Sequence, residues 1–182
     1  VYSVLRRHDE PHALLDNGRD IEGGHSSEFN VMYSESVEGI IDLQEGRQRQ
    51  AAARFRLAVN ASRRGLSFSH SSGNAWAGVL HASTLYEADQ LAEAARLLHV
   101  YVPLARDVGL ADHMILGDTM LSRIAFHNGD VDGAFQILTG LEHIGRVRQL
   151  DRVVAGARLE RSRLLLLQGH GRAALQELER AE

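Results

Sequence analysis

The chain has 182 residues, a formal net charge of −4 and no cysteine, and all 20 of its basic residues are arginine. Disulfides, cysteine nucleophiles, Schiff-base lysines and the lysine of a phosphate-binding P-loop are therefore excluded. Arginine and acidic residues are interleaved, and the longest apolar run, Leu164 to Leu167, is far shorter than the roughly 20 residues that span a bilayer. We expect a cytoplasmic chain with no membrane partner and no surface-wide footprint for nucleic acid.

Residues 1–30 are predicted to be irregular, or the remnant of a preceding repeat. The stretch VYSVLRRHDEPHALL has helical character, whereas DNGRDIEGGHSSE is rich in Gly, Asp and Ser, as loops are. The chain starts at Val1 rather than at methionine and ends at Glu182 inside a predicted helix. We therefore expect it to be a fragment of a longer protein.

From residue 31 onward, a short pattern recurs after Gly46, Asp89, Gly129 and Gly169. In each copy an alanine follows five positions later, a large apolar residue four positions after that, and a small residue lies twelve positions before the alanine. The alanines are Ala51, Ala94, Ala134 and Ala174, the large residues Phe55, Leu98, Leu138 and Leu178, and the small residues Gly39, Ala82, Ser122 and Ser162. Successive alanines are 43, 40 and 40 positions apart.

This repeat predicts an all-α fold, a right-handed α-α superhelix of about four TPR-like helical hairpins over residues 31–182. Small residues let the two helices of a hairpin approach closely, and a Gly or Asp with positive φ ends the first helix. The predicted first helices are 31–44, 72–87, 111–127 and 151–168, and the second helices are 47–63, 90–107, 131–144 and 171–182. Gly65, Gly109 and Gly145 are predicted to mark the turns between hairpins.

The small-residue, alanine and leucine spacing resembles the tetratricopeptide repeat, with a longer period. Within that superfamily, the runs LYEADQLAEAARLL, PLARDVGLADHMI and ARLERSRLLL resemble the TPR-like sensor region of MalT-type, LuxR-family ATP-dependent transcriptional regulators. The resemblance implies a non-catalytic, signal-sensing part that binds a small-molecule inducer or a partner protein and needs no cofactor. ATP and DNA would be bound only by domains absent from this chain, since no G-x-x-x-x-G-K-[ST] motif occurs.

The repeat alignment also predicts which side chains line the concave groove of the superhelix. The groove positions on the first helices are Trp76, Val79, Ser83 and Tyr86, then Leu116, Thr119, Arg123 and Phe126, then Gly156, Leu159, Arg163 and Leu166. From these we select as ligand-binding residues Trp76, Ser83, Tyr86, Thr119, Arg123, Phe126 and Arg163. Arg123 and Arg163 share one repeat position, and beside the aromatic residues they would suit an anionic or aromatic ligand or an acidic peptide. The alternative is that the arginines pair with Asp118 or Glu160 and the aromatic residues are core.

The sequence gives weaker support for a metal site, a catalytic site or a DNA-binding surface. His8 and His12 are spaced for one helix face, but Pro11 and the lack of accompanying ligands argue against a metal site. No catalytic motif is present, so we predict that the chain is not an enzyme. The arginine-rich stretch from Arg146 to Arg163 suits a salt-bridged surface better than a DNA contact.

The rival hypothesis to a sensor is a stand-alone TPR scaffold that holds a partner peptide. Exposed solenoid ends would also allow a homo-oligomer.

Overall fold

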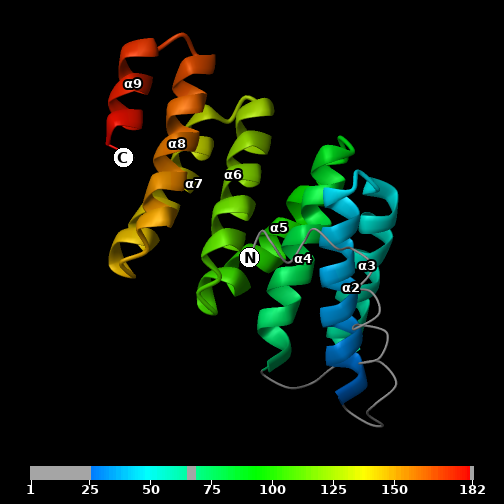
Figure 1. Cartoon of the computed structure of the whole chain (residues 1–182). Helices are drawn as coiled ribbons and strands as arrows, with labels where there is room; N and C mark the ends of the chain where they lie inside the picture. The colour runs from blue at the N-terminus through cyan, green and yellow to red at the C-terminus, as the bar shows by residue number, and fades with distance from the viewer. Residues whose placement is uncertain (1–25, 65–68, 181–182) are drawn as a thin grey trace.

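The computed structural model describes residues 26–64 and 69–180, and these form helices joined by turns, without a strand (Figure 1). The helices are α2 (Ser26–Gln44), α3 (Gln48–Arg64), α4 (Ser69–Glu87), α5 (Leu91–Asp107), α6 (Ala111–His127), α7 (Val131–Val147), α8 (Asp151–Leu167) and α9 (Gly171–Glu179). The all-α prediction is confirmed, and most helix ends lie within three residues of their predicted places. Helix α2 starts five residues earlier than predicted. The predictions for residues 1–25 and Gly65 lie outside the described residues.

The hairpins stack in chain order, from α2–α3 at one end to α8–α9 at the other (Figure 1). Each helix contacts the next one in the chain, and the first helices α2, α4, α6 and α8 also contact one another in a row. Within the described ranges, the second helices contact only their neighbours in sequence. The first helices therefore form one continuous layer and the second helices cover it, as in helical-repeat superhelices.

Residues with positive φ end the helices, because the left-handed conformation closes the last turn. Those residues are Gly46, Asp89, Gly109, Gly129, Gln149 and Gly169. From Asp89 onward they recur every 20 residues, and α5, α6, α7 and α8 each have 17 residues. The next backbone N–H then bonds back across the turn, as Leu110 N–H does to the Ala105 carbonyl at 3.0 Å. One helix and its turn thus make a 20-residue unit, and two units give the 40-residue repeat.

The predicted turn at Gly145 is wrong, whereas that at Gly109 is confirmed by its φ of 75°. Gly145 is buried inside α7, where a Cβ atom would lie 2.9 Å from Val154 Cγ2 of α8. The glycine therefore serves close contact between two helices. Gln149 takes the left-handed position of that turn instead, with a φ of 56°.

The predicted seam of small residues lies between the two helices of each hairpin. At Gly39 a Cβ atom would come within 2.5 Å of the Phe55 ring, so the glycine makes room for the ring. The Ser122 hydroxyl donates to the carbonyl of Ala134 at 3.0 Å, and the Ser162 hydroxyl donates to the carbonyl of Ala174 at 2.8 Å. In the third and fourth hairpins the repeat alanine is therefore contacted directly by the serine twelve positions before it.

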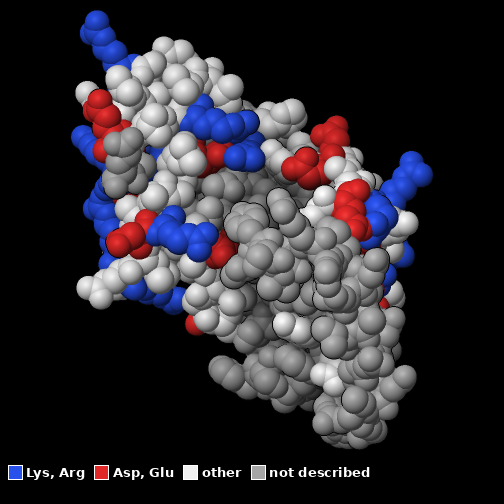
Figure 2. Space-filling model, viewed as in Figure 1, with Lys and Arg blue, Asp and Glu red and all other residues white. Residues whose placement is uncertain are grey.

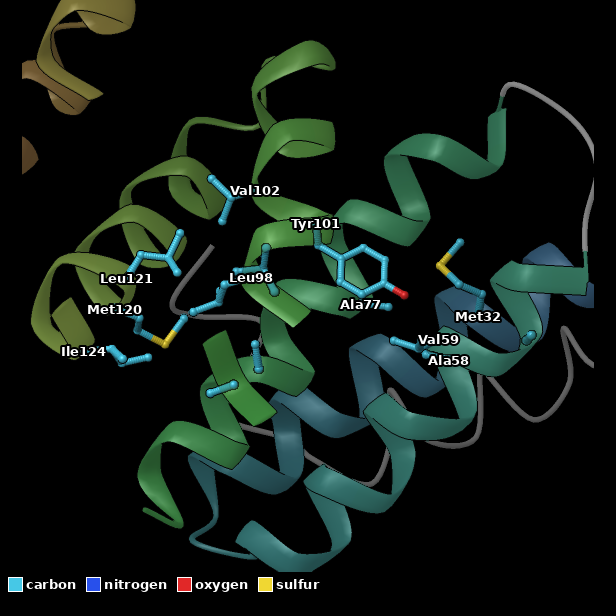
Figure 3. Close-up of a cluster of buried hydrophobic side chains, with 14 residues drawn as sticks. Met32, Ala58, Val59, Ala77, Leu98, Tyr101, Val102, Met120, Leu121 and Ile124 are labelled. Atoms are coloured by element: carbon cyan, nitrogen blue, oxygen red, sulfur yellow. The ribbon is translucent and has the colours of Figure 1, made fainter. Parts of the chain in front are cut away.

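The largest core cluster runs through the stack from α2 to α6 (Figure 3). Leu98 and Val102 of α5 face Met120 and Leu121 of α6, while Tyr101 points toward α4 (Figure 3). Because these side chains belong to successive hairpins, burial of apolar surface fixes each hairpin on the next one.

Two helical glycines give a matched test of this packing. At Gly78 of α4 a Cβ atom would meet the buried Tyr101 ring at 2.2 Å, whereas at Gly140 of α7 it would meet nothing within 4 Å. We expect Gly78→Ala to lower the free energy of unfolding by about 1–2 kcal/mol through overpacking. Gly140→Ala should raise it by up to about 1 kcal/mol, because alanine favours the helix. Urea denaturation of both variants measures this, and equal effects would contradict the close contact at Tyr101.

Candidate functional site

The predicted groove residue Trp76 lies in a row of aromatic rings that crosses three first helices. Its ring centroid is 5.5 Å from that of Tyr33 on α2, at an interplanar angle of 57°. On its other side His113 of α6 lies 6.3 Å away, nearly edge-on at 87°. Burial lowers the pKa of His113, and the nearby Asp112 carboxylate opposes this only in part. We call Tyr33, Trp76 and His113 the aromatic row; the neutral imidazole suits its contact with the indole.

The two predicted arginines share one buried carboxylate. Arg123 of α6 donates from Nε and Nη2 to both oxygens of Glu160 on α8, at 2.8 and 2.6 Å, and Arg163 donates to Oε1 at 3.0 Å. Glu160 is only 4% exposed. The hydrogen bond to Glu160 raises the pKa of Arg123 against the opposing effect of burial, with a smaller contribution from Tyr86. This Arg123–Glu160–Arg163 cluster links α6 to α8 and leaves one net positive charge.

Asp118, the other acid considered as a partner for these arginines, is paired elsewhere. Arg106 of α5 donates from Nη2 to Asp118 Oδ1 at 2.5 Å and from Nε to Oδ2 at 3.3 Å. The Asp118 side chain is fully buried, and this burial raises its pKa, while the Arg106 guanidinium lowers it in part. The pair therefore fixes α5 on α6.

The other predicted groove residues lie mostly between hairpins. The Ser83 hydroxyl donates to the Leu80 carbonyl at 2.7 Å, and the Thr119 hydroxyl to the Leu116 carbonyl at 3.1 Å, so both bond within their own helix. Phe126 packs against a buried cluster of α7 and α8. Val79 is fully buried, and Thr119 is 9% exposed. The groove positions thus do not share one direction: Arg123 reaches the next first helix, α8, whereas Gly156 lies against Ile115 of the preceding α6 and Trp76 lies between α2 and α6.

Two of the predicted residues, Tyr86 and Arg123, nevertheless line a pocket of about 270 Å³ near the ends of α4 and α6. The lining is Tyr86, Glu87, Asp89, Leu91, Arg123, Ile124 and His127. We call this the α4–α6 pocket. A second pocket of about 500 Å³ shares Asp89, Leu91 and His127 with it and adds Glu93 and Arg96.

The electrostatics of the α4–α6 pocket differ from the sequence prediction. Glu87 and Asp89 supply two carboxylates, whereas the charge of Arg123 is already engaged by Glu160. The C-terminal ends of α4 and α6 add partial negative charge, and the N-terminal end of α5 at Leu91 adds a smaller opposing contribution to the two full carboxylate charges. The pocket therefore suits a cationic or hydrogen-bonding group better than the anion that the two arginines suggested.

The arginine-rich stretch from Arg146 to Arg163 forms a network of ion pairs around Glu142 of α7. Arg146, Arg158 and Arg161 donate to its carboxylate at 2.7, 2.9 and 2.8 Å, and Arg161 also binds Glu177 of α9 at 2.9 Å. In Figure 2 basic and acidic side chains lie beside one another over this part of the stack. These bonds agree with the expected salt-bridged surface and join three helices.

Within the described ranges, no group of three or more His, Cys, Asp or Glu residues could hold a metal ion. His8 and His12 lie outside these ranges. Among the helices that the structure describes, none is long and apolar enough to cross a bilayer.

Comparison of the chain with protein-family models, with curated proteins and with solved structures finds no match. The class of protein that the structure itself defines is an all-α helical-repeat stack.

Glu142 gives a prediction for the pH dependence of stability. Burial would raise its pKa, but the hydrogen bonds from Arg161 and Arg158 and the charges of Arg161 and Arg146 outweigh burial and lower the pKa to about 2. A carboxylate with a depressed pKa stabilises the fold above its unfolded pKa, and this stability is lost as the pH falls toward the folded value. Between about pH 4.5 and 2, the urea midpoint should therefore fall more steeply in the wild type than in Glu142→Gln. Parallel curves would contradict the network.

Glu160 gives a second prediction. Glu160→Gln leaves Arg123 and Arg163 without their carboxylate, so we expect the free energy of unfolding to fall by about 1–3 kcal/mol. The matched control is Glu179→Gln, at an exposed position of α9, where a change within about 0.5 kcal/mol is expected. If both variants unfold at the same urea concentration, the cluster does not hold α6 on α8.

Proposed function

We propose that this chain is a non-catalytic, signal-sensing helical-repeat module, the TPR-like part of a MalT-type, LuxR-family transcriptional regulator. The resemblance of the runs from Ala75 to Leu167 supports the family, and the continuous layer of first helices supports a binding role. In this proposal the module works in the cytoplasm and binds a small-molecule inducer or a partner protein. ATP and DNA are bound by other domains of the regulator.

The observation that carries the proposal is the position of the α4–α6 pocket beside Arg123. A ligand there touches Tyr86 of one hairpin and Arg123 of the next, and Arg123 in turn holds Glu160 of a third hairpin. A helical-repeat stack is held together by contacts between neighbouring hairpins. A ligand that binds more tightly to one arrangement of Tyr86, Arg123 and Glu160 therefore shifts how these three hairpins stack. Occupancy of a small pocket thus changes the shape of a long module.

The second candidate function, a scaffold for a partner peptide, is favoured by the aromatic row. Tyr33 is 47% exposed and its ring lies tilted against that of Trp76, so the row presents aromatic surface at the α2 end. Amphipathic helices and extended peptides bind to aromatic surfaces of this kind. The parent reading frame distinguishes the two hypotheses. A nucleotide-binding module upstream and a helix-turn-helix downstream would favour the sensor over the scaffold.

The pocket can be tested with the double variant Glu87→Gln/Asp89→Asn, which removes both carboxylates while asparagine keeps the left-handed turn at position 89. A thermal-shift screen of cationic and neutral metabolites should find compounds that raise the melting temperature of the wild type. For those compounds we expect the variant to bind about tenfold or more weakly, since hydrogen bonds to charged groups are lost.

The matched control is Asp107→Asn, which removes an exposed carboxylate at the end of α5, outside the pocket, and should bind as the wild type does. If no compound stabilises the wild type, or if the double variant binds all of them unchanged, the α4–α6 pocket is not the sensing site. Compounds that lose affinity only on Trp76→Ala would instead place the sensing site at the aromatic row.

A further inference from the structure

The last hairpin repeats the surface by which each earlier hairpin contacts the next one. On α6, Arg123 bonds to Glu160 of α8 and Phe126 packs against the cluster that includes Leu164 of α8, while Thr119, one turn before Arg123, is 9% exposed. Forty residues later the same positions on α8 are Leu159, Arg163 and Leu166. The α8–α9 hairpin ends the described stack, and no described helix lies beyond it (Figure 1).

The apolar positions of this surface are buried or half-buried in the third hairpin and exposed in the fourth. Thr119 is 9% exposed, whereas Leu159 is 58% exposed. On the second helices, Leu138 of α7 is fully buried, and its equivalent Leu178 of α9 is 41% exposed. Leu166 and Leu175 are 60% and 56% exposed, whereas Phe126 and Phe135 at their repeat positions pack against the α7–α8 cluster. Four leucines thus form an uncovered apolar surface, which we call the end face.

Charge at the end face indicates what would cover it. In the third hairpin Arg123 reaches across to Glu160 on the next first helix, with two short hydrogen bonds. Arg163 occupies the same position one repeat later, and its side chain is 49% exposed with one bond, to Glu160 of its own helix. The guanidinium is therefore placed to take a carboxylate from a helix that follows α8 as α8 follows α6.

We propose that the end face, together with Arg163, binds a further helical hairpin built to the same repeat. The first helix of that hairpin covers Leu159 and Leu166 with apolar side chains and offers Arg163 a carboxylate at the position equivalent to Glu160. The interaction continues the hairpin-to-hairpin interface already present between α6–α7 and α8–α9. It is independent of the ligand at the α4–α6 pocket.

A fusion protein tests the proposal with the chain's own hairpin as the probe. A second copy of residues 143–182, placed directly after Glu182, keeps the 40-residue register and brings the Glu160 of the copy to the position facing Arg163. We expect a single cooperative transition with a melting temperature about 4 °C or more above that of the unfused chain. Amide hydrogen exchange in α8 should slow over residues 159–166.

Variants separate this interface from general stabilisation. In the fusion, Leu159→Ser/Leu166→Ser in the original α8 should abolish the gain, and Arg163→Gln should reduce it. In the unfused chain the leucine substitutions should change little, because these side chains are already exposed. Arg172→Gln, at an exposed position of α9, should keep the full gain.

Two outcomes would overturn the proposal. One is a fused copy that unfolds separately and leaves both the melting temperature and the exchange of α8 unchanged. The other is an unfused chain that sediments as a dimer, is returned to a monomer by Leu159→Ser/Leu166→Ser, and gains nothing from the fusion. The end face would then belong to a second copy of the chain.

Discussion

The fold depends on close contact between helices at small residues. Gly39 lies against Phe55, and the hydroxyls of Ser122 and Ser162 bond to the carbonyls of the repeat alanines. A larger side chain at any of these positions would push the two helices of the hairpin apart. This contact sets the distance between the helices of each hairpin, and the turns with positive φ set where each helix ends. Everything else in the stack, including the pocket between α4 and α6, is positioned by these two features.

Ionic contacts add a second level of order on top of this packing. Asp118 and Glu160 are acids in the interior of the first-helix layer, and each is bound by an arginine from another helix. Burying such charges costs free energy, and their pairing restores part of it, so their main effect is to admit one arrangement of neighbouring hairpins. Breaking one link should loosen a boundary between hairpins before it unfolds a helix, and the proposed sensing mechanism needs such a loosened state.

The helices were predictable because their signals are local: turn residues and small residues recur with the repeat, and each specifies conformation over a few positions. The turn at Gln149 could not be predicted, because glycine is the usual left-handed residue and Gly145 lay nearby. The actual role of Gly145, close contact with Val154, depends on how the helices pack.

The candidate site was predicted only in part. Tyr86 and Arg123 were both among the predicted groove residues, at different repeat positions, but which neighbour each side chain faces is set by the stacking of hairpins. Glu87 and His127 are 40 residues apart and end α4 and α6, so they share one repeat position, but the predicted groove stopped one residue short of it, at Tyr86 and Phe126.

The 20-residue unit has a consequence for how such a chain can change in length. Adding or removing one helix with its turn would exchange the two layers for every residue that follows, so side chains suited to the first-helix row would face outward. Adding or removing two units leaves each later helix in its own layer, with its small residue still opposite its alanine. Length can therefore vary without loss of the fold only in steps of about 40 residues, and each step extends or shortens the row of first helices by one.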